Sequence, residues 1–177
     1  MDDQAMRARI EGLIRNVPDF PQPGIQFKDI TPVLQDPQGL RAAIDAVAEP
    51  LKGKEIDAIV GLESRGFLFG APIAYNMSLG FVIIRKPGKL PADTIDVKYE
   101  LEYGSNVLEM HRDSITPGQR VVIVDDLLAT GGTARGAATL VEQLGGVVVG
   151  FSFLIELEFL QGREKLAGYD IHSIIRY

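Results

Sequence analysis

The stretch VVIVDDLLATGGT, residues 121–133, restricts the possible fold of this chain more than any other. Its first four residues are apolar and β-branched, which is typical of a strand buried on both faces. Asp125 and Asp126 follow where this strand is expected to end. A turn of small residues comes next, made of Ala129, Thr130, Gly131, Gly132 and Thr133. Residues 134–144 then have a helical pattern, so the stretch predicts a strand, a tight turn and a helix in succession.

This turn has the properties of a phosphate site. A glycine turn at a helix start presents backbone N–H groups and the positive end of the helix dipole to one point. The two carboxylates would repel phosphate, but a carboxylate accepts hydrogen bonds from two neighbouring sugar hydroxyls. The acid pair and the turn together therefore predict a site for ribose 5-phosphate. Taken alone, an Asp-Asp pair is more often a turn former or a helix cap, and a Gly-Gly pair is only a turn.

A second turn of the same kind follows residues 56–60, which predict another buried strand. This turn contains Glu63, Ser64, Arg65 and Gly66. A helix is expected to continue from it to about Met77. An arginine at a helix start is unfavourable for the helix dipole, so a bound anion explains it better than a surface role. Neither turn is a Walker motif, which needs Lys after its last glycine, and the chain contains no GxGxxG.

A basic segment follows the next predicted strand, residues 80–84. Its sequence is RKPGKLP, residues 85–91. A basic loop is usually only solvated, but in a chain of formal net charge −6 it is also a candidate for holding phosphates. Residues 92–106 alternate weakly, and residues 107–111 are expected to form a strand that pairs back on them.

The N-terminal segment combines prolines with apolar residues. Residues 3–15 have helical spacing, but four prolines within residues 17–32 argue against a helix or a strand there. The same segment carries aromatic residues, so it is either a loop held to the core by them or a cover over a ligand site. Asp36 and Pro37 predict the cap and the first residue of a helix that runs to about Ala48.

Composition excludes several classes of protein. The 177 residues fit one domain, and 46% of them are hydrophobic, enough for a sizeable core. The lack of cysteine excludes disulfides, Cys-zinc sites and thiol catalysis. The negative charge argues against a general nucleic-acid binder. The N-terminal residues MDDQAMRARI do not resemble a secretory signal, and the longest apolar stretch, residues 145–155, is too short to span a bilayer.

Strands that alternate with helices predict an α/β fold with a central, mostly parallel sheet flanked by helices. Both anion turns follow strands, so both are expected at the carboxyl ends of the strands, where ligands bind in such sheets. His111 and His172 have no partner at metal-ligand spacing, and both are expected to be structural.

The sequence motifs resemble those of a known family. VVIVDDLLATGGT is similar to the phosphoribosyl-diphosphate binding motif of the type I phosphoribosyltransferases. PDFPQPGIQFKDITPVL, GLESRGFLFG, RKPGKLP and LEYG narrow the resemblance to the adenine phosphoribosyltransferases, from about residue 17 to the C-terminus. The resemblance implies a single domain over residues 1–177, with an N-terminal hood at about 1–34, a core at about 35–177 and a flexible lid loop at about 86–106. It also implies purine salvage, in which adenine and phosphoribosyl diphosphate give AMP and diphosphate.

The resemblance assigns roles to individual residues. Catalytic roles fall to Glu102, as the proton carrier, and Arg65. The residues expected at the ribose and 5-phosphate are Asp125, Asp126, Ala129, Thr130, Gly131, Gly132 and Thr133. Those expected at the diphosphate are Glu63, Ser64, Arg65, Gly66, Arg85, Lys89 and Tyr103. Those expected at adenine are Gln26, Phe27, Lys28 and Leu127, with Phe27 and Leu127 sandwiching the ring.

The expected cofactor is Mg²⁺, held mainly by the substrate phosphates and by no direct protein ligand. The expected partners are adenine and phosphoribosyl diphosphate, in a cytoplasmic homodimer that binds no nucleic acid or membrane. Two alternatives remain. A regulator that senses phosphoribosyl diphosphate would need an effector surface, and none is visible in the sequence. A 6-oxopurine or pyrimidine enzyme of the same fold is opposed only by the hood.

Overall fold

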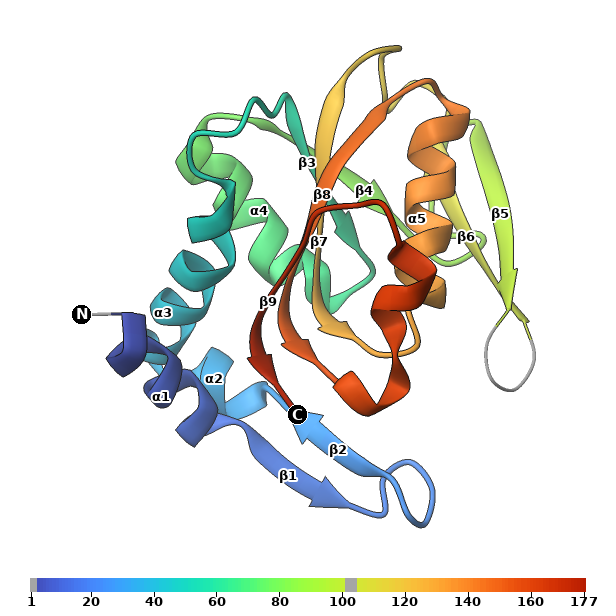
Figure 1. The fold of residues 1–177 in the computed structure, drawn as a ribbon. Helices are drawn as coiled ribbons and strands as arrows, with labels where there is room; N and C mark the ends of the chain where they lie inside the picture. The colour runs from blue at the N-terminus through green and yellow to red at the C-terminus, as the bar shows by residue number, and fades with distance from the viewer. Residues whose placement is uncertain (1–2, 101–104) are drawn as a thin grey trace.

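The computed structural model describes residues 3–100 and 105–177. A five-stranded sheet forms its centre, with the strand order β4-β3-β7-β8-β9 and every neighbouring pair parallel (Figure 1). The strands are β3 (Ala58–Leu62), β4 (Gly80–Ile84), β7 (Arg120–Leu128), β8 (Val147–Glu156) and β9 (Ile171–Arg176). The predicted α/β fold with a parallel central sheet is therefore confirmed.

Helices cover both faces of this sheet (Figure 1). One face is covered by α3 (Pro37–Ala48) and α4 (Arg65–Met77), with α1 (Asp3–Leu13) and α2 (Thr31–Gln35) beside α3. The other face is covered by α5 (Gly132–Gln143). Val122 and Val124 pack in the hydrophobic core under α3 and α4, and Val121 and Ile123 pack in the core under α5. Because successive side chains of a strand point to opposite faces, this run is buried on both sides, as predicted.

An antiparallel ribbon lies against α5 on the second face. It consists of β5 (Thr94–Glu100) and β6 (Ser105–His111), so the predicted strand at residues 107–111 does pair back on the preceding segment. Short 3₁₀ helices complete the chain: η1 (Glu49–Leu51), η2 (Glu158–Leu160) and η3 (Gly162–Leu166). The predicted lid residues Glu102 and Tyr103 lie outside the described residues.

Two expectations about regular structure were wrong. The proline-rich segment contains β1 (Arg15–Pro18) and β2 (Gln26–Asp29), which pair as an antiparallel hairpin. The prolines are compatible with it because Pro18 is the last residue of its strand and the next two prolines lie in the connection, where no ladder N–H is needed. Strand β7 also continues through Asp125 and Asp126 to Leu128, because β8 pairs with it over that length.

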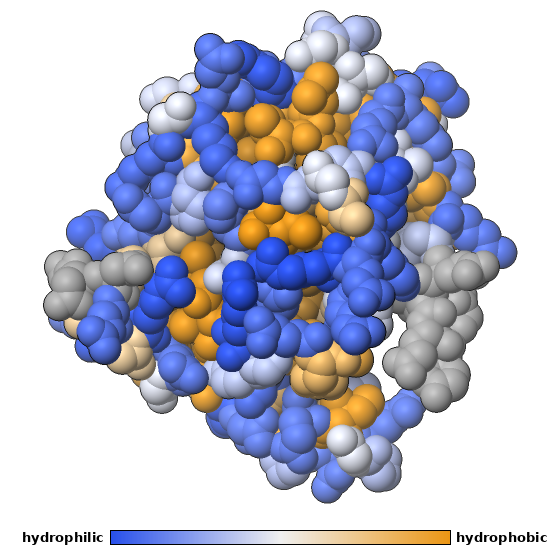
Figure 2. Space-filling model, viewed as in Figure 1, coloured by the Kyte–Doolittle hydropathy of each residue, from blue (hydrophilic) through white to orange (hydrophobic). Residues whose placement is uncertain are grey.

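The predicted cap of α3 is confirmed. Oδ1 of Asp36 accepts a hydrogen bond from the backbone N–H of Gly39 at 2.5 Å, and Pro37 is the first residue of the helix. Across residues 3–100 and 105–177 no helix has the length and apolar character needed to cross a membrane. Figure 2 shows that hydrophilic residues dominate the face of the molecule seen in Figure 1, with apolar residues exposed there in separate patches.

Candidate active site

The two predicted anion turns meet at one edge of the sheet. β3 and β7 are parallel neighbours, so their carboxyl ends, and the turns that follow them, lie side by side. From β3 the chain continues to β4 on one side, whereas β7 and β8 lie on the other side. Such a switch point leaves a crevice beyond the strand ends, the usual ligand site of open parallel sheets.

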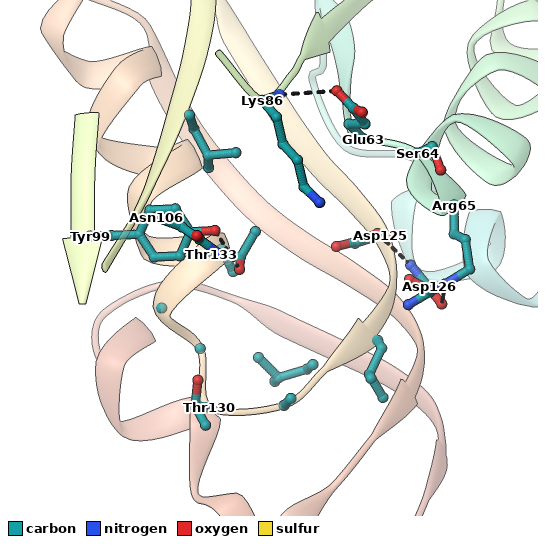
Figure 3. A pocket seen from close by; sticks show the side chains of 17 residues that line it. Glu63, Ser64, Arg65, Lys86, Tyr99, Asn106, Asp125, Asp126, Thr130 and Thr133 are labelled. Atoms are coloured by element: carbon teal, nitrogen blue, oxygen red, sulfur yellow. Dashed lines mark hydrogen bonds and ion pairs between the residues drawn. The ribbon is translucent and has the colours of Figure 1, made fainter. Parts of the chain in front are cut away.

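A cavity of about 370 Å³ occupies this crevice (Figure 3). It brings together eleven of the residues predicted from the sequence: Glu63, Ser64, Arg65, Asp125, Asp126, Leu127, Ala129, Thr130, Gly131, Gly132 and Thr133. It also has wall residues that were not predicted: Lys86, Tyr99, Asn106, Leu108, Leu128 and Ala134. The cavity therefore combines both anion turns with the acid pair.

The predicted phosphate turn, residues 130–133, overlaps the start of α5. Gly131 is the N-cap residue, with φ of +78°, a left-handed conformation that favours glycine. No side chain caps this helix, so the first N–H groups of α5 remain available to a ligand. The start of α4 is similar, because its N-cap residue Ser64 makes no side-chain cap bond. Two helix N-termini thus face one cavity, an arrangement that suits two phosphate groups.

A close backbone contact fixes the shape of the phosphate turn. A Cβ atom on Gly131 would lie 2.3 Å from the carbonyl oxygen of Gly162. A Cβ atom on Gly162 would lie 2.2 Å from the carbonyl oxygen of Ala129. The turn and the start of η3 are therefore packed backbone against backbone, and neither glycine has room for a side chain.

A partly buried ion pair holds η3 in this position. Arg163, the second residue of η3, donates from Nε and Nη2 to the two carboxylate oxygens of Glu156 at 2.7 and 2.8 Å. It also donates from Nη1 to the carbonyl oxygen of Ile171 at 3.2 Å. Glu156 is the last residue of β8 and is almost completely buried. Arg163 thereby joins η3 to the end of β8 and the start of β9 behind the phosphate turn, so η3 supports this turn.

The acid pair is linked to the other anion turn. Nε of Arg65 donates to Oδ2 of Asp126, which is 6% exposed. Burial lowers the pKa of Arg65, but the carboxylates of Asp126 and Asp125 outweigh it and raise the pKa overall. Burial, and then the neighbouring Asp126, raise the pKa of Asp125 well above its usual range. Asp125 points into the cavity (Figure 3).

Glycine is also required where α4 starts. A Cβ atom on Gly66 would lie 2.7 Å from the carbonyl oxygen of Val124 and 3.0 Å from Oδ1 of Asp125. This contact brings the turn of residues 63–66 against β7. The peptide bond between Glu63 and Ser64 is cis. Gly66 does not line the cavity itself, but it sets how closely Arg65 approaches the acid pair.

The basic segment after β4 supplies a different cation from those expected. Nε of Arg85 donates to Oε2 of Glu63 at 3.1 Å, and Nη1 donates to the carbonyl oxygen of Lys89 at 3.2 Å. Neither Arg85 nor Lys89 lines the cavity, whereas the Lys86 side chain extends into it (Figure 3). Glu63 also accepts from the Lys86 N–H at 3.0 Å. Burial raises the pKa of Glu63, but the bonds and charges of Lys86 and Arg85 lower it overall. Through these two bonds the Glu63 carboxylate orients the basic segment.

A second, more apolar cavity of about 410 Å³ lies under the β1–β2 hairpin. Its walls contain two of the predicted adenine residues and several others: Val17, Phe20, Phe27, Lys28, Asp29, Ile30, Thr31, Leu34 and Arg65. Arg65 lines both cavities, and its guanidinium carbon lies 6.0 Å from the centre of the Phe27 ring. The two cavities therefore meet at this arginine.

The structure separates the four predicted adenine residues. Phe27 lines the second cavity, but Leu127 lines the first, so the expected sandwich would span the junction of the two. Gln26 is exposed, and its Oε1 accepts from Asn16 Nδ2 at 2.7 Å. Nζ of Lys28 lies 3.8 Å from the centre of the Tyr177 ring, which ties the hairpin to the end of β9.

Within residues 3–100 and 105–177 no three His, Cys, Asp or Glu side chains are grouped to hold a metal ion. Asp125 and Asp126 are adjacent carboxylates that line the first cavity, together with Glu63. Two adjacent carboxylates suit a hydrated Mg²⁺ whose other ligands are water and phosphate oxygens.

The sequence and the fold are similar to those of known phosphoribosyltransferases. Residues 30–171 match the family model for the phosphoribosyl transferase domain. An adenine phosphoribosyltransferase of Roseiflexus sp. strain RS-1 is 57% identical over 172 residues, covering 97% of this chain and 100% of the relative. The crystal structure of the adenine phosphoribosyltransferase from Thermoanaerobacter pseudethanolicus superimposes with a TM-score of 0.94 at 57% identity, over 97% of this chain and 99% of that one. The Saccharomyces cerevisiae enzyme, complexed with D-2,5-dideoxy-2,5-imino-altritol 1,6-bisphosphate and adenine, gives a TM-score of 0.90 at 40% identity, over 97% and 99% of the two chains.

Proposed function

The chain belongs to the adenine phosphoribosyltransferases, and from this premise we propose which of its residues bind each part of the substrates. The enzyme is a pentosyltransferase of purine salvage that transfers the 5-phosphoribosyl group from phosphoribosyl diphosphate to adenine, giving AMP and diphosphate. One observation carries the assignment: a polar cavity with two uncapped helix starts meets an apolar cavity at Arg65.

The 5-phosphate is assigned to the turn of residues 130–133. Its backbone N–H groups and the dipole of α5 favour an anion, and no acidic side chain belongs to the turn. The ribose hydroxyls are assigned to Asp125 and Asp126, which lie beside the turn on β7. Hydrogen bonds to ionised groups contribute about 1.5–3 kcal/mol each. The substrate would therefore be fixed at both ends of its sugar.

The diphosphate is assigned to the start of α4, with Ser64 and Arg65, and to the basic segment that Glu63 orients. Displacement at C1 of the sugar passes through an oxocarbenium-like state, in which positive charge grows on the ribose and negative charge on the leaving group. Arg65 and Lys86 face the leaving group, and fixed charges of this kind stabilise it most in the transition state. Mg²⁺, held mainly by the substrate oxygens near the acid pair, would supply further positive charge.

Adenine is assigned to the apolar cavity and its junction with the first cavity. Phe27 offers a ring face, and the backbone of residues 25–28 offers C=O and N–H groups. The acidic wall residue Asp29 is already bonded to Arg15 and Thr31. Residues 1–34 act as the hood in this proposal, and residues 86–106 as the lid. Glu102 would carry a proton to or from the purine, as the family resemblance implies.

The substrate assignment is tested with labelled bases. The parent enzyme is incubated with phosphoribosyl diphosphate, Mg²⁺ and adenine, hypoxanthine, guanine or uracil, and nucleotide formation is measured. AMP formation from adenine should exceed the products from the other bases by orders of magnitude. Efficient use of hypoxanthine or uracil would contradict the assignment of the apolar cavity to adenine. Omitting Mg²⁺ in the presence of a chelator should remove the activity, and full activity under these conditions would contradict the proposed cofactor.

A cytoplasmic homodimer is also part of the proposal. It comes from the family resemblance, in which the segment around Arg85 lies near the subunit boundary. In this chain Arg85 is held by its own Glu63 and Lys89, so its segment is already ordered for such a contact. Sedimentation velocity at assay concentration should give a dimer, and a fully active monomer would remove the idea.

A further inference from the structure

Tyr99 joins the β5–β6 ribbon to the phosphate turn (Figure 3). Its hydroxyl oxygen accepts a hydrogen bond from Oγ1 of Thr133 at 3.3 Å. Thr133 is the second residue of α5 and the last residue of the turn assigned to the 5-phosphate. Tyr99 and Thr133 both line the first cavity, so this bond lies at the ligand site itself.

The Tyr99 ring is held separately from its hydroxyl. A Cβ atom on Gly136 would lie 3.3 Å from Cδ1 of Tyr99, so the ring lies directly on α5, one turn after Thr133. In the ribbon Tyr99 pairs with Asn106, which also lines the cavity. The ring packs against the core beneath α5 together with Val97. Removing the hydroxyl therefore leaves the packing of the ring in place.

The direction of the hydrogen bond can reverse when an anion binds. A threonine hydroxyl has one proton, and in this structure Oγ1 of Thr133 is assigned as the donor to Tyr99. If Thr133 donates instead to a phosphate oxygen, its Oγ1 can still accept, and the Tyr99 hydroxyl has a proton to donate. The bonds would then run from Tyr99 to Thr133 to the phosphate, and a charged acceptor strengthens each bond of such a chain.

We propose that Tyr99 is a positioning residue for the 5-phosphate, acting through Thr133, and that phosphate binding thereby secures the β5–β6 ribbon on α5. The inference rests on the proposed function, in which residues 130–133 bind the 5-phosphate. It extends that function because it links the occupied phosphate turn to the ribbon that carries the predicted lid residues.

The test compares Tyr99→Phe with Tyr75→Phe, a matched control at a side chain of α4 that is 85% exposed. Ribose 5-phosphate is titrated calorimetrically into the parent and both variants. Loss of one neutral hydrogen bond should weaken binding by about 3- to 10-fold in Tyr99→Phe, with the KM for adenine unchanged and parent-like binding in Tyr75→Phe. In a Thr133→Val background, Tyr99→Phe should have no further effect, because the partner hydroxyl is absent.

Amide hydrogen exchange provides a readout that stability alone would not change. Ribose 5-phosphate should slow exchange at residues 94–100 and 105–111 in the parent and in Tyr75→Phe, and slow it less in Tyr99→Phe. A parent that binds ribose 5-phosphate, with a Tyr99→Phe variant that binds it equally well, overturns this inference alone. An additional loss in the Thr133→Val background also overturns it. A parent that does not bind ribose 5-phosphate overturns the assignment of the turn, and the inference with it.

Discussion

Arg65, at the start of α4, forms a hydrogen-bonded ion pair with Asp126 of β7. Arg65 belongs to the proposed diphosphate turn, whereas Asp126 belongs to the pair proposed to bind the ribose. Under the proposed assignment, the Arg65 cation is shared between a carboxylate of the protein and the phosphates of the substrate. A substrate with both a diphosphate and neighbouring hydroxyls provides new partners for both side chains at once. Diphosphate alone would provide a partner only for the arginine.

Replacing Asp126 tests this relationship. Asp126→Asn should lower kcat/KM for phosphoribosyl diphosphate tens- to hundreds-fold, because charged hydrogen bonds contribute about 1.5–3 kcal/mol each. The KM of this variant for phosphoribosyl diphosphate should rise, and its circular dichroism spectrum should match that of the parent. Asp113→Asn, at an exposed turn, is the control and should behave as the parent. Unchanged kinetics in Asp126→Asn would mean that the acid pair is only structural.

The backbone contact behind the phosphate turn is tested by two alanine variants. Gly53 and Gly131 have similar positive φ angles, +75° and +78°, but only Gly131 has a neighbour within contact distance. Gly53→Ala should cost about 1–2 kcal/mol for the left-handed conformation. Gly131→Ala should cost more and should also abolish AMP binding, measured by calorimetry. Equal losses of stability, with AMP binding retained, would contradict the close contact.

The support of η3 is tested at Arg163. Arg163→Met leaves the buried Glu156 with the more distant Arg176, 3.7 Å away, as its cationic partner. Removing one member of an ion pair costs roughly 3–5 kcal/mol when both groups are buried. We expect the lower end of that range, because the Arg163 side chain is 36% exposed. Arg120→Met is the matched control, since Arg120 pairs with the exposed Glu55 and Asp57 and its loss should change the melting temperature little. Similar melting temperatures for the two variants would contradict a special role for the Glu156 pair.

The same pair predicts a dependence of stability on pH. Burial raises the pKa of Glu156, but the hydrogen bonds and charges of Arg163, with Ser173 and Arg176, lower it overall. The ionised Glu156 carboxylate therefore makes its full contribution to the free energy of unfolding above the unfolded-state pKa of about 4.3. This contribution is lost as pH falls through the lower folded-state pKa. Glu156→Gln should flatten the decline of the unfolding free energy below about pH 5. Parallel acid titrations of parent and variant by urea unfolding would argue against this.

Adenine specificity is predicted to depend on the hood backbone. Gln26→Ala should keep the preference for adenine over hypoxanthine at about 10⁴-fold or more in kcat/KM, because a peptide C=O and N–H match the adenine edge and oppose the hypoxanthine edge. The exposed position of the Gln26 side chain, paired with Asn16, agrees with this expectation. If Gln26→Ala admits hypoxanthine, the side chain reads the base after all.

Glu102 is predicted to act on the chemical step. Glu102→Gln should reduce kcat strongly while the melting temperature changes little, because the resemblance places this residue in a lid and not in the core. A large loss of stability with normal kcat would assign Glu102 to packing instead.

Local sequence patterns were enough to predict most of the fold. The Asp36 cap, the apolar strand at residues 121–124 and the glycine turns after β3 and β7 are decided by neighbours in the chain, so they were predicted where they occur. The hairpin of residues 15–29 was missed because prolines oppose strands in general, whereas here they lie at strand ends and in the connection.

Site residues that depend on tertiary placement could not be predicted in the same way. Tyr99 and Asn106 reach the cavity only because the β5–β6 ribbon lies on α5. Lys86, and not Lys89, faces the cavity because Glu63 holds its backbone N–H. No residue pattern near Gly162 distinguishes it from an ordinary turn glycine, and its role depends on a contact with a segment distant in the sequence.

The backbone contact of Gly131 with Gly162 has a consequence for protein engineering. A phosphate turn grafted into another α/β protein as residues 129–133 alone would lack the surface against which it is shaped. The segment that begins at residue 162 would have to be transplanted with it, although the two are separated by a whole helix and strand. The smallest portable unit of the proposed phosphate site is therefore discontinuous in sequence, and a loop-swapping library that varies only one of the two segments would recover few binders.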